Sequence, residues 1–240
     1  MDLKIKDVAE LLNVSETTIR RWLRERIIPA YKLNHQYRFD RDEIQHWMMS
    51  RKLKQGKGNF LPERDEETIK DKEERTSGGE KRGIQQFSLY RAIHRGGILT
   101  DIEAGDKAAV IRQTMEAVAS DLALDPSVMT ELLLDREKLM PTALNHGIAV
   151  PHTRDFLFKG QTDVVVVVFP KEPIDWGALD QQLVKVLFFL FACDDKRHLH
   201  LLAKLAHLSS NDEALELLLS QPNKQELFSY IKAWEAKVGA

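Results

Sequence analysis

Cysteine is nearly absent from this sequence, because only one of the 240 residues, Cys193, is a cysteine. A single cysteine excludes a disulfide within the chain, and the apolar surroundings at 187–193 favour a small core residue over a reactive thiol. The longest apolar runs fall well short of the roughly 18 residues that a membrane-spanning helix needs. No charged-then-apolar leader follows Met1. We therefore expect a reduced, cytoplasmic protein.

Motifs of several enzyme classes are missing as well. The sequence has neither a glycine-rich phosphate-cradling loop nor a serine nucleophile elbow. Its histidines and Cys193 lack the spacing of metal ligands. We therefore expect no metal and no cofactor. Hydrophobic residues make up 43% of the chain and charged residues 30%, which is typical of a globular protein of one large or two modest domains.

Charge is divided unevenly along the chain. The net charge is −2, but residues 1–52 hold eleven Lys and Arg against eight Asp and Glu, leaving 24 against 29 in the remainder. Residues 53–83 mix both signs with glycine and few apolar side chains, so they cannot bury enough surface to form a core. We predict a basic domain at 1–52, a charged flexible linker at 53–83 and a larger domain at 84–240.

The basic segment has the pattern of a helix-turn-helix. Apolar residues within 5–12 share one helical face, and Ser15 can cap a second helix over 16–23. Two short helices joined by a tight turn form this motif. The second helix would present hydroxyls and guanidinium groups to base edges and phosphates in a major groove. The candidate DNA-contacting residues are Thr17, Thr18, Arg20, Arg21 and Arg24.

The residues that follow predict a wing. Residues 30–33 and 36–39 alternate like two short strands that turn at Asn34-His35. Asp40 and Glu43 form a capping box for a third helix, whose Ile44 and Trp47 would face the core. In a winged arrangement the hairpin lies along the DNA backbone or minor groove. Its candidate contacts are His35, Gln36 and Arg38.

Residues 3–51 resemble the excisionase and MerR-like family of small winged DNA-binding domains. The similarity is carried by residues 7–12, 17–22, 28–30 and 37–39. It implies binding to double-stranded DNA. We expect a homodimer that reads two half-sites, because one domain of about fifty residues offers too little contact for tight specific binding.

The larger domain alternates helical and strand-like patterns. Continuous Val and Phe in the strand-like runs favour a sheet covered on both faces, and therefore an α/β mixed-sheet sandwich. Residues 87–95 are amphipathic, and 98–102 read as an edge strand. The other predicted strands are 142–150, 162–169 and 183–192, and the predicted helices are 107–122, 126–136, 198–208, 212–219 and 224–238.

His152 is the leading candidate for chemistry. It ends the apolar run Gly147-Ile148-Ala149-Val150-Pro151, and a neutral imidazole in such a place can accept a phosphoryl group. The alternative is a histidine that is merely structural or exposed, and we interpret His146, His200 and His207 as packing or surface residues.

Residues 137–154, with support from 174–180 and 198–206, resemble enzyme IIA of the fructose and mannitol class of the bacterial sugar phosphotransferase system. The nitrogen-regulatory enzyme IIA belongs to the same class. The resemblance spans about residues 87–238 and implies an enzyme IIA-like fold. It further implies that His152 takes a phosphoryl group from a histidine phosphocarrier protein, that His198 lies beside it as a hydrogen-bond donor, and that Arg154 adds charge stabilisation.

Three functions follow from these features. The first is a DNA-binding transcriptional regulator controlled by reversible phosphorylation of His152. The second is a phosphocarrier that passes the group to a sugar permease, which would make the protein a phosphotransferase. Departures from the family pattern at Asn145, His146 and Thr153 argue against this second function. The third is an adaptor whose enzyme IIA-like fold binds proteins without accepting phosphate.

Overall fold

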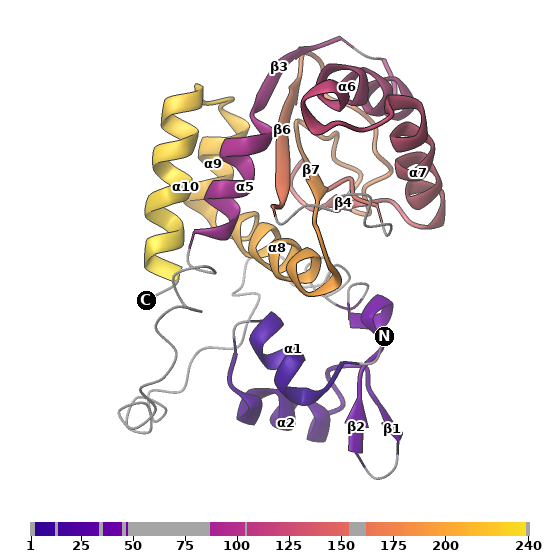
Figure 1. Cartoon of the computed structure of the whole chain (residues 1–240). Coiled ribbons are helices and arrows are strands. Elements are labelled where there is room, and N and C mark those ends of the chain that lie inside the picture. The colour runs from indigo at the N-terminus through magenta and orange to yellow at the C-terminus, as the bar shows by residue number, and fades with distance from the viewer. Residues whose placement is uncertain are drawn as a thin grey trace.

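The computed structural model describes residues 3–12, 14–33, 36–44, 47, 87–103, 105–153 and 162–238. They form a small N-terminal unit (described residues 3–47) and a larger unit (described residues 87–238), shown in Figure 1. The predicted linker at 53–83 and two predicted site residues, His35 and Arg154, lie outside the described residues. No described helix is long and apolar enough to cross a membrane.

The N-terminal unit contains the predicted pair of helices and the hairpin. Helix α1 spans Ile5–Leu11 and α2 spans Glu16–Arg24, with the Ser15 hydroxyl accepting the Thr18 N–H at 3.1 Å. Strands β1 (Tyr31–Leu33) and β2 (Gln36–Arg38) pair antiparallel. Their shared core confirms the helix-turn-helix with its hairpin. It is built from Val8, Leu11, Leu12, Ile19, Trp22, Ile28, Phe39 and Ile44.

A mixed five-stranded sheet forms the centre of the larger unit. The strand order is β3-β6-β7-β5-β4, with β3 parallel to β6, β6 antiparallel to β7, β7 parallel to β5 and β5 antiparallel to β4. Every residue of β6 and β7 is buried, as the continuous Val and Phe runs predicted. The strands are β3 (Ile98–Ile102), β4 (Ala143–Leu144), β5 (Ile148–Ala149), β6 (Val164–Pro170) and β7 (Val186–Phe191).

Helices cover both faces of this sheet, which confirms the predicted α/β mixed-sheet sandwich (Figure 1). Alternate residues of β6 and β7 belong to two separate core clusters, because successive side chains of a strand point to opposite faces. One face packs against α6 (Lys107–Leu122) and α7 (Pro126–Leu139). The other packs against α5 (Ser88–Gly96), α8 (Asp195–Leu208), α9 (Asp212–Leu219) and α10 (Lys224–Val238).

Two predicted elements differ from the observed ones. The strand expected over 142–150 is split into β4 and β5 by a turn, because His146 and Gly147 adopt positive φ angles of 67° and 75°. The His146 N–H donates to Asp180 Oδ2 at 2.8 Å, which holds the turn. Helix α8 begins at Asp195, ahead of the expected start at His198, since Asp194 caps it by accepting the Arg197 N–H.

Helices α5 and α10 are joined by one buried carboxylate. Glu235 accepts the backbone N–H groups of Leu89 and Tyr90 at 3.1 and 2.7 Å, at the start of a helix that lacks a side-chain cap of its own. Glu235 also pairs with Lys204 of α8 at 2.5 Å. Three helices that are distant in sequence are thereby fixed to one another.

Candidate functional site

His152 lies just beyond the end of β5, in line with that strand. Residue 152 forms an isolated parallel bridge with Leu190 of β7, and the Leu190 N–H donates to the Pro151 carbonyl at 2.9 Å. The backbone on both sides of the imidazole is therefore held by the rigid centre of the sheet. The side chain is fully buried, with 0% of its surface exposed.

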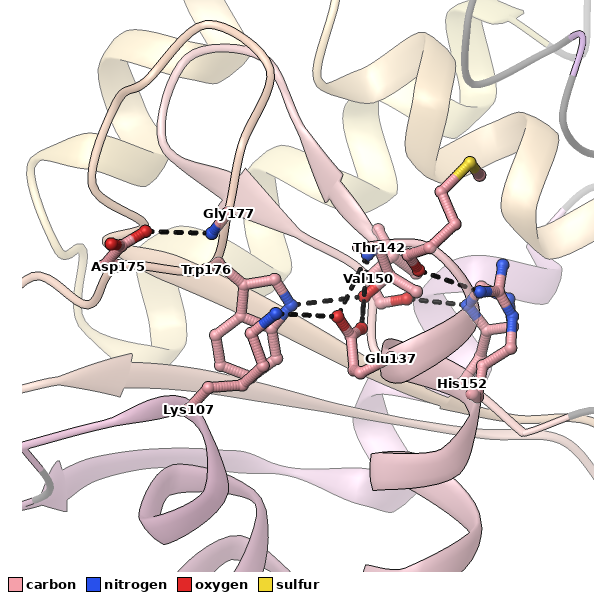
Figure 2. A network of polar contacts seen from close by, with 10 residues as sticks. Lys107, Glu137, Thr142, Val150, His152, Asp175, Trp176 and Gly177 are labelled. Carbon is pink, nitrogen blue, oxygen red and sulfur yellow. Dashed lines mark hydrogen bonds and ion pairs between the residues drawn. The ribbon is translucent and has the colours of Figure 1, made fainter.

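One hydrogen bond fixes the proton arrangement of the His152 ring. Nδ1 lies 2.7 Å from the Val150 carbonyl oxygen, as Figure 2 shows. A carbonyl oxygen only accepts, so Nδ1 must carry the proton and donate it. In the neutral ring the lone pair then resides on Nε2, the nitrogen on the other side of the ring. Any nucleophilic attack by this ring would therefore start from Nε2.

His198, in the first turns of α8, lies next to His152 as expected from the sequence. The two ring centroids are 5.1 Å apart and the rings are tilted by 64°. His198 is 1% exposed. Burial lowers the pKa of His198 well below its ordinary value of 6.5, and His152, Arg41 and Arg136 lower it further. His198 is therefore neutral at pH 7.

The depressed pKa of His198 predicts a pH-dependent stability. Below about pH 6.5 the unfolded chain binds a proton on His198 while the folded chain does not, so the free energy of unfolding should decrease as the pH falls. Urea unfolding between pH 7.5 and 5 would measure the slope. His198→Gln, which stays neutral, should give a flatter dependence. Equal slopes in the two proteins would contradict the assignment.

Two arginines near His198 were not predicted from the sequence. Arg136 of α7 is 3% exposed, and its Nη1 donates to the Met140 carbonyl at 3.0 Å. Arg41 belongs to the N-terminal unit. Each lies close enough to disfavour the charged form of His198. Both resemble ordinary solvated charges in the sequence, and only the position of Arg136, one residue before the motif at 137–154, gave a signal.

A buried polar network supports the segment that leads to β4. Glu137 accepts the backbone N–H and the hydroxyl of Thr142, and it pairs with Lys107 at 3.3 Å (Figure 2). The Trp176 indole N–H points to the Thr142 hydroxyl at 3.4 Å. The network lies beside Val150 in Figure 2. It fixes the backbone that ends at His152.

The predicted DNA-contacting residues lie together on the N-terminal unit. In α2, Thr17, Arg20 and Arg24 are exposed, Arg21 is half-buried, and the Thr18 hydroxyl lies 2.9 Å from that of Ser15. Arg20 is 3.6 Å from Glu16. In the hairpin, Arg38 donates to Gln36 Oε1 at 2.8 Å. Helix α2 lies on the far side of α1 from α8 (Figure 1), so its exposed face is open to a partner.

No cluster of three or more metal-binding side chains occurs among the residues with a described structure. The structure thus brings together His152 and His198, adds Arg136 and Arg41, and groups the α2 and hairpin residues at a separate surface.

Comparison with protein families accounts for both units. Residues 92–234, more than half of the chain, match the family "Phosphoenolpyruvate-dependent sugar phosphotransferase system, EIIA 2". The chain belongs to this family. Residues 3–52 match a helix-turn-helix domain family. We therefore refer to residues 92–234 as the EIIA domain and to residues 3–52 as the helix-turn-helix domain.

Relatives of the EIIA domain include regulatory proteins. A "Nitrogen regulatory protein" of Pseudomonas aeruginosa is 32% identical over 146 residues, covering 60% of this chain and 94% of the relative. A "Multiphosphoryl transfer protein" of Escherichia coli O157:H7 is 37% identical over 129 residues, covering 52% of this chain and 32% of the relative. The crystal structure of nitrogen regulatory protein IIA-Ntr from Neisseria meningitidis has a TM-score of 0.51 at 26% identity, covering 60% and 94% of the two chains.

Proposed function

We propose that this protein is a DNA-binding transcriptional regulator controlled by reversible phosphorylation of His152. The observation that carries the proposal is the pairing of His152 with His198. Nδ1 of His152 is held by Val150, Nε2 carries the lone pair, and a second, neutral imidazole lies 5.1 Å away between ring centroids. The similarity to nitrogen regulatory proteins supports a regulatory role over a purely metabolic one.

The proposed phosphoryl transfer uses His152 as the acceptor and His198 and nearby arginines as supporting groups. The donor is the phosphohistidine of a histidine phosphocarrier protein. The Nε2 lone pair of His152 forms a bond to phosphorus while the donor's N–P bond breaks and its electron pair returns to the donor imidazole. The Nδ1 proton stays on His152 and remains hydrogen-bonded to Val150. A neutral His198 can donate its remaining N–H to the phosphoryl oxygens, with Arg136 and Arg154 supplying positive charge.

The output is DNA binding by the helix-turn-helix domain. Thr17, Arg20 and Arg24 are exposed on α2 and suited to base edges and phosphates, and the hairpin supplies Gln36 and Arg38. We extend the proposal to a cytoplasmic homodimer that reads two half-sites on double-stranded DNA. The division into domains at 1–52 and 84–240, joined by 53–83, separates input from output.

A second candidate, the non-phosphorylated adaptor, is favoured by one observation: His152 is fully buried in this arrangement of the chain. A carrier protein needs direct access to the imidazole. If the protein is an adaptor, it takes up no phosphoryl group, whereas the regulator does. Phosphoryl uptake therefore distinguishes the two functions.

Phosphoryl labelling distinguishes these functions. Incubation with phosphoenolpyruvate, the general phosphotransferase enzyme and its histidine phosphocarrier should place acid-labile label on the chain, and peptide mapping should locate it at His152. DNA selected from a random double-stranded pool should then bind with different affinity to the labelled and unlabelled protein. Arg20→Ala should weaken binding in both states. Absence of label would favour the adaptor, and passage of label to a sugar would favour the phosphocarrier.

A further inference from the structure

Arg41 connects the helix-turn-helix domain to the candidate phosphorylation site. It begins a helical stretch at 41–44 of the N-terminal unit. Its Nη1 lies 2.6 Å from Asp195 Oδ1 at the start of α8. Nevertheless its side chain is only 13% exposed, and the Nε and Nη2 atoms are screened from solvent. An arginine of the N-terminal unit is thus largely withdrawn from solvent while it pairs with a carboxylate of the larger unit.

The contact lies next to the histidine pair. Asp195 precedes His198 by three residues on α8, so the two side chains lie near the same face of the helix. Arg41 itself lies close enough to His198 to affect its protonation. Helix α1 also packs along α8 (Figure 1), and apolar side chains of both helices belong to one continuous core cluster. The two domains therefore meet directly beside the candidate acceptor.

We propose that the helix-turn-helix domain is an intramolecular cover over His152 and His198, latched by the Arg41–Asp195 ion pair, and that a phosphoryl donor reaches His152 only after this latch opens. His152 and His198 are 0% and 1% exposed with the cover in place, so neither a donor protein nor a covalently attached phosphoryl group fits in the closed form. Closure and phosphorylation therefore oppose each other, and by linkage each weakens the other by the same factor. The signal to the DNA-binding domain is its release.

The cover leaves the DNA-reading surface accessible. Helix α2 lies on the opposite side of the small domain from α8 (Figure 1), and Arg20 and Arg24 are exposed. Closure thus restrains the position of α2 rather than blocking its face. In a dimer, restrained and released reading helices would suit different spacings of half-sites.

The cover can be tested without any phosphoryl transfer. Diethyl pyrocarbonate modifies accessible neutral imidazoles. The full chain is modified, and mass spectrometry of its peptides then measures the rate of modification at His152. Removing one partner of a largely buried ion pair should raise the open fraction, so we expect modification in Arg41→Ala to be about tenfold faster than in the wild type. The matched control is Lys4→Ala, which removes a positive charge from an exposed position of the same domain. It should react at the wild-type rate.

A charge-swapped chain tests the latch itself. The double variant Arg41→Asp, Asp195→Arg should restore slow modification, whereas Arg41→Asp alone should be fast. Equal rates in the wild type and Arg41→Ala, or failure of the swap to restore protection, would overturn the cover.

The signalling role of the cover rests on the proposed function. Labelling by the histidine phosphocarrier tests the cover and the proposed function separately. Faster labelling in Arg41→Ala supports the cover as a gate for phosphorylation. Faster pyrocarbonate modification without any label in either protein keeps the cover and refutes phosphorylation of His152. Faster pyrocarbonate modification with slower labelling in Arg41→Ala would instead show that Arg41 assists phosphoryl transfer. That result would overturn the proposal that Arg41 acts only as a latch.

Discussion

A chain with alanine at position 152 is expected to take up no acid-labile phosphoryl label from the histidine phosphocarrier. The reason is that Nε2 of His152 is the proposed nucleophile, and alanine leaves no atom that can form the N–P bond. His198 cannot substitute for it, because His198 enters the site from α8 rather than from the strand end that positions His152. The measurement is radiolabel retained on the full chain after gel separation at alkaline pH.

The substitution also removes a buried ring and leaves the Val150 carbonyl without its donor, so stability must be monitored. His152→Gln provides a second variant that retains an amide donor near this position. His94→Ala is the matched control, because His94 is an exposed histidine on α5 that stacks on Phe228. It should label as the wild type does. Label in the His152 variants would reject the assigned acceptor.

Replacing Gly96 by alanine is expected to have the largest effect on folding. Gly96 is the last residue of α5, and a Cβ there would lie 2.2 Å from the Val165 carbonyl oxygen of β6. The atoms that the new Cβ would meet belong to the backbone of β6, which is buried along its whole length. Neither this backbone nor that of α5 can move without disturbing the packed core. Separating α5 from β6 should cost about 3 kcal/mol or more of unfolding free energy.

Thermal unfolding followed by circular dichroism would measure this loss, expected as a decrease in Tm of about 10 °C for a chain of this size. Gly105→Ala is the matched control, because nothing lies within 4 Å of the position its Cβ would take. It should leave Tm almost unchanged. A similar Tm for the two variants would mean that α5 does not pack on β6 as closely as described.

The strongest sequence signals located the core of the fold and the two histidines. Continuous valine in β6 and phenylalanine in β7 indicate strands buried on both faces. The apolar run that ends at Pro151 singles out His152, the residue that follows it. The hydrophobic pattern gave a wrong prediction where the backbone conformation of two residues determines where a strand ends. Residues 142–150 are apolar enough for one strand, but left-handed residues at 146 and 147 divide them into two.

Contacts between the domains could not be predicted from the sequence. Each domain has a complete hydrophobic pattern of its own, so nothing in the periodicity signals that α1 and α8 meet. Arg41 and Arg136 are long charged side chains near helix ends, where most such residues are solvated. Their burial beside His198 depends entirely on tertiary packing. For the same reason, the complete burial of His152 was not foreseen.

Glu235 makes the packing of α5 and α8 depend on a single side chain of α10. This residue supplies the missing cap of α5 and the counter-ion of Lys204, whose pKa burial lowers and Glu235 raises. Because Glu235 belongs to α10, the start of α5 is capped only when α10 packs against α5 and α8. A prematurely terminated or C-terminally clipped chain would retain an intact helix-turn-helix sequence but lack the carboxylate that unites α5, α8 and α10. Such a fragment would keep the helix-turn-helix domain while losing the helix packing that supports α8 and His198.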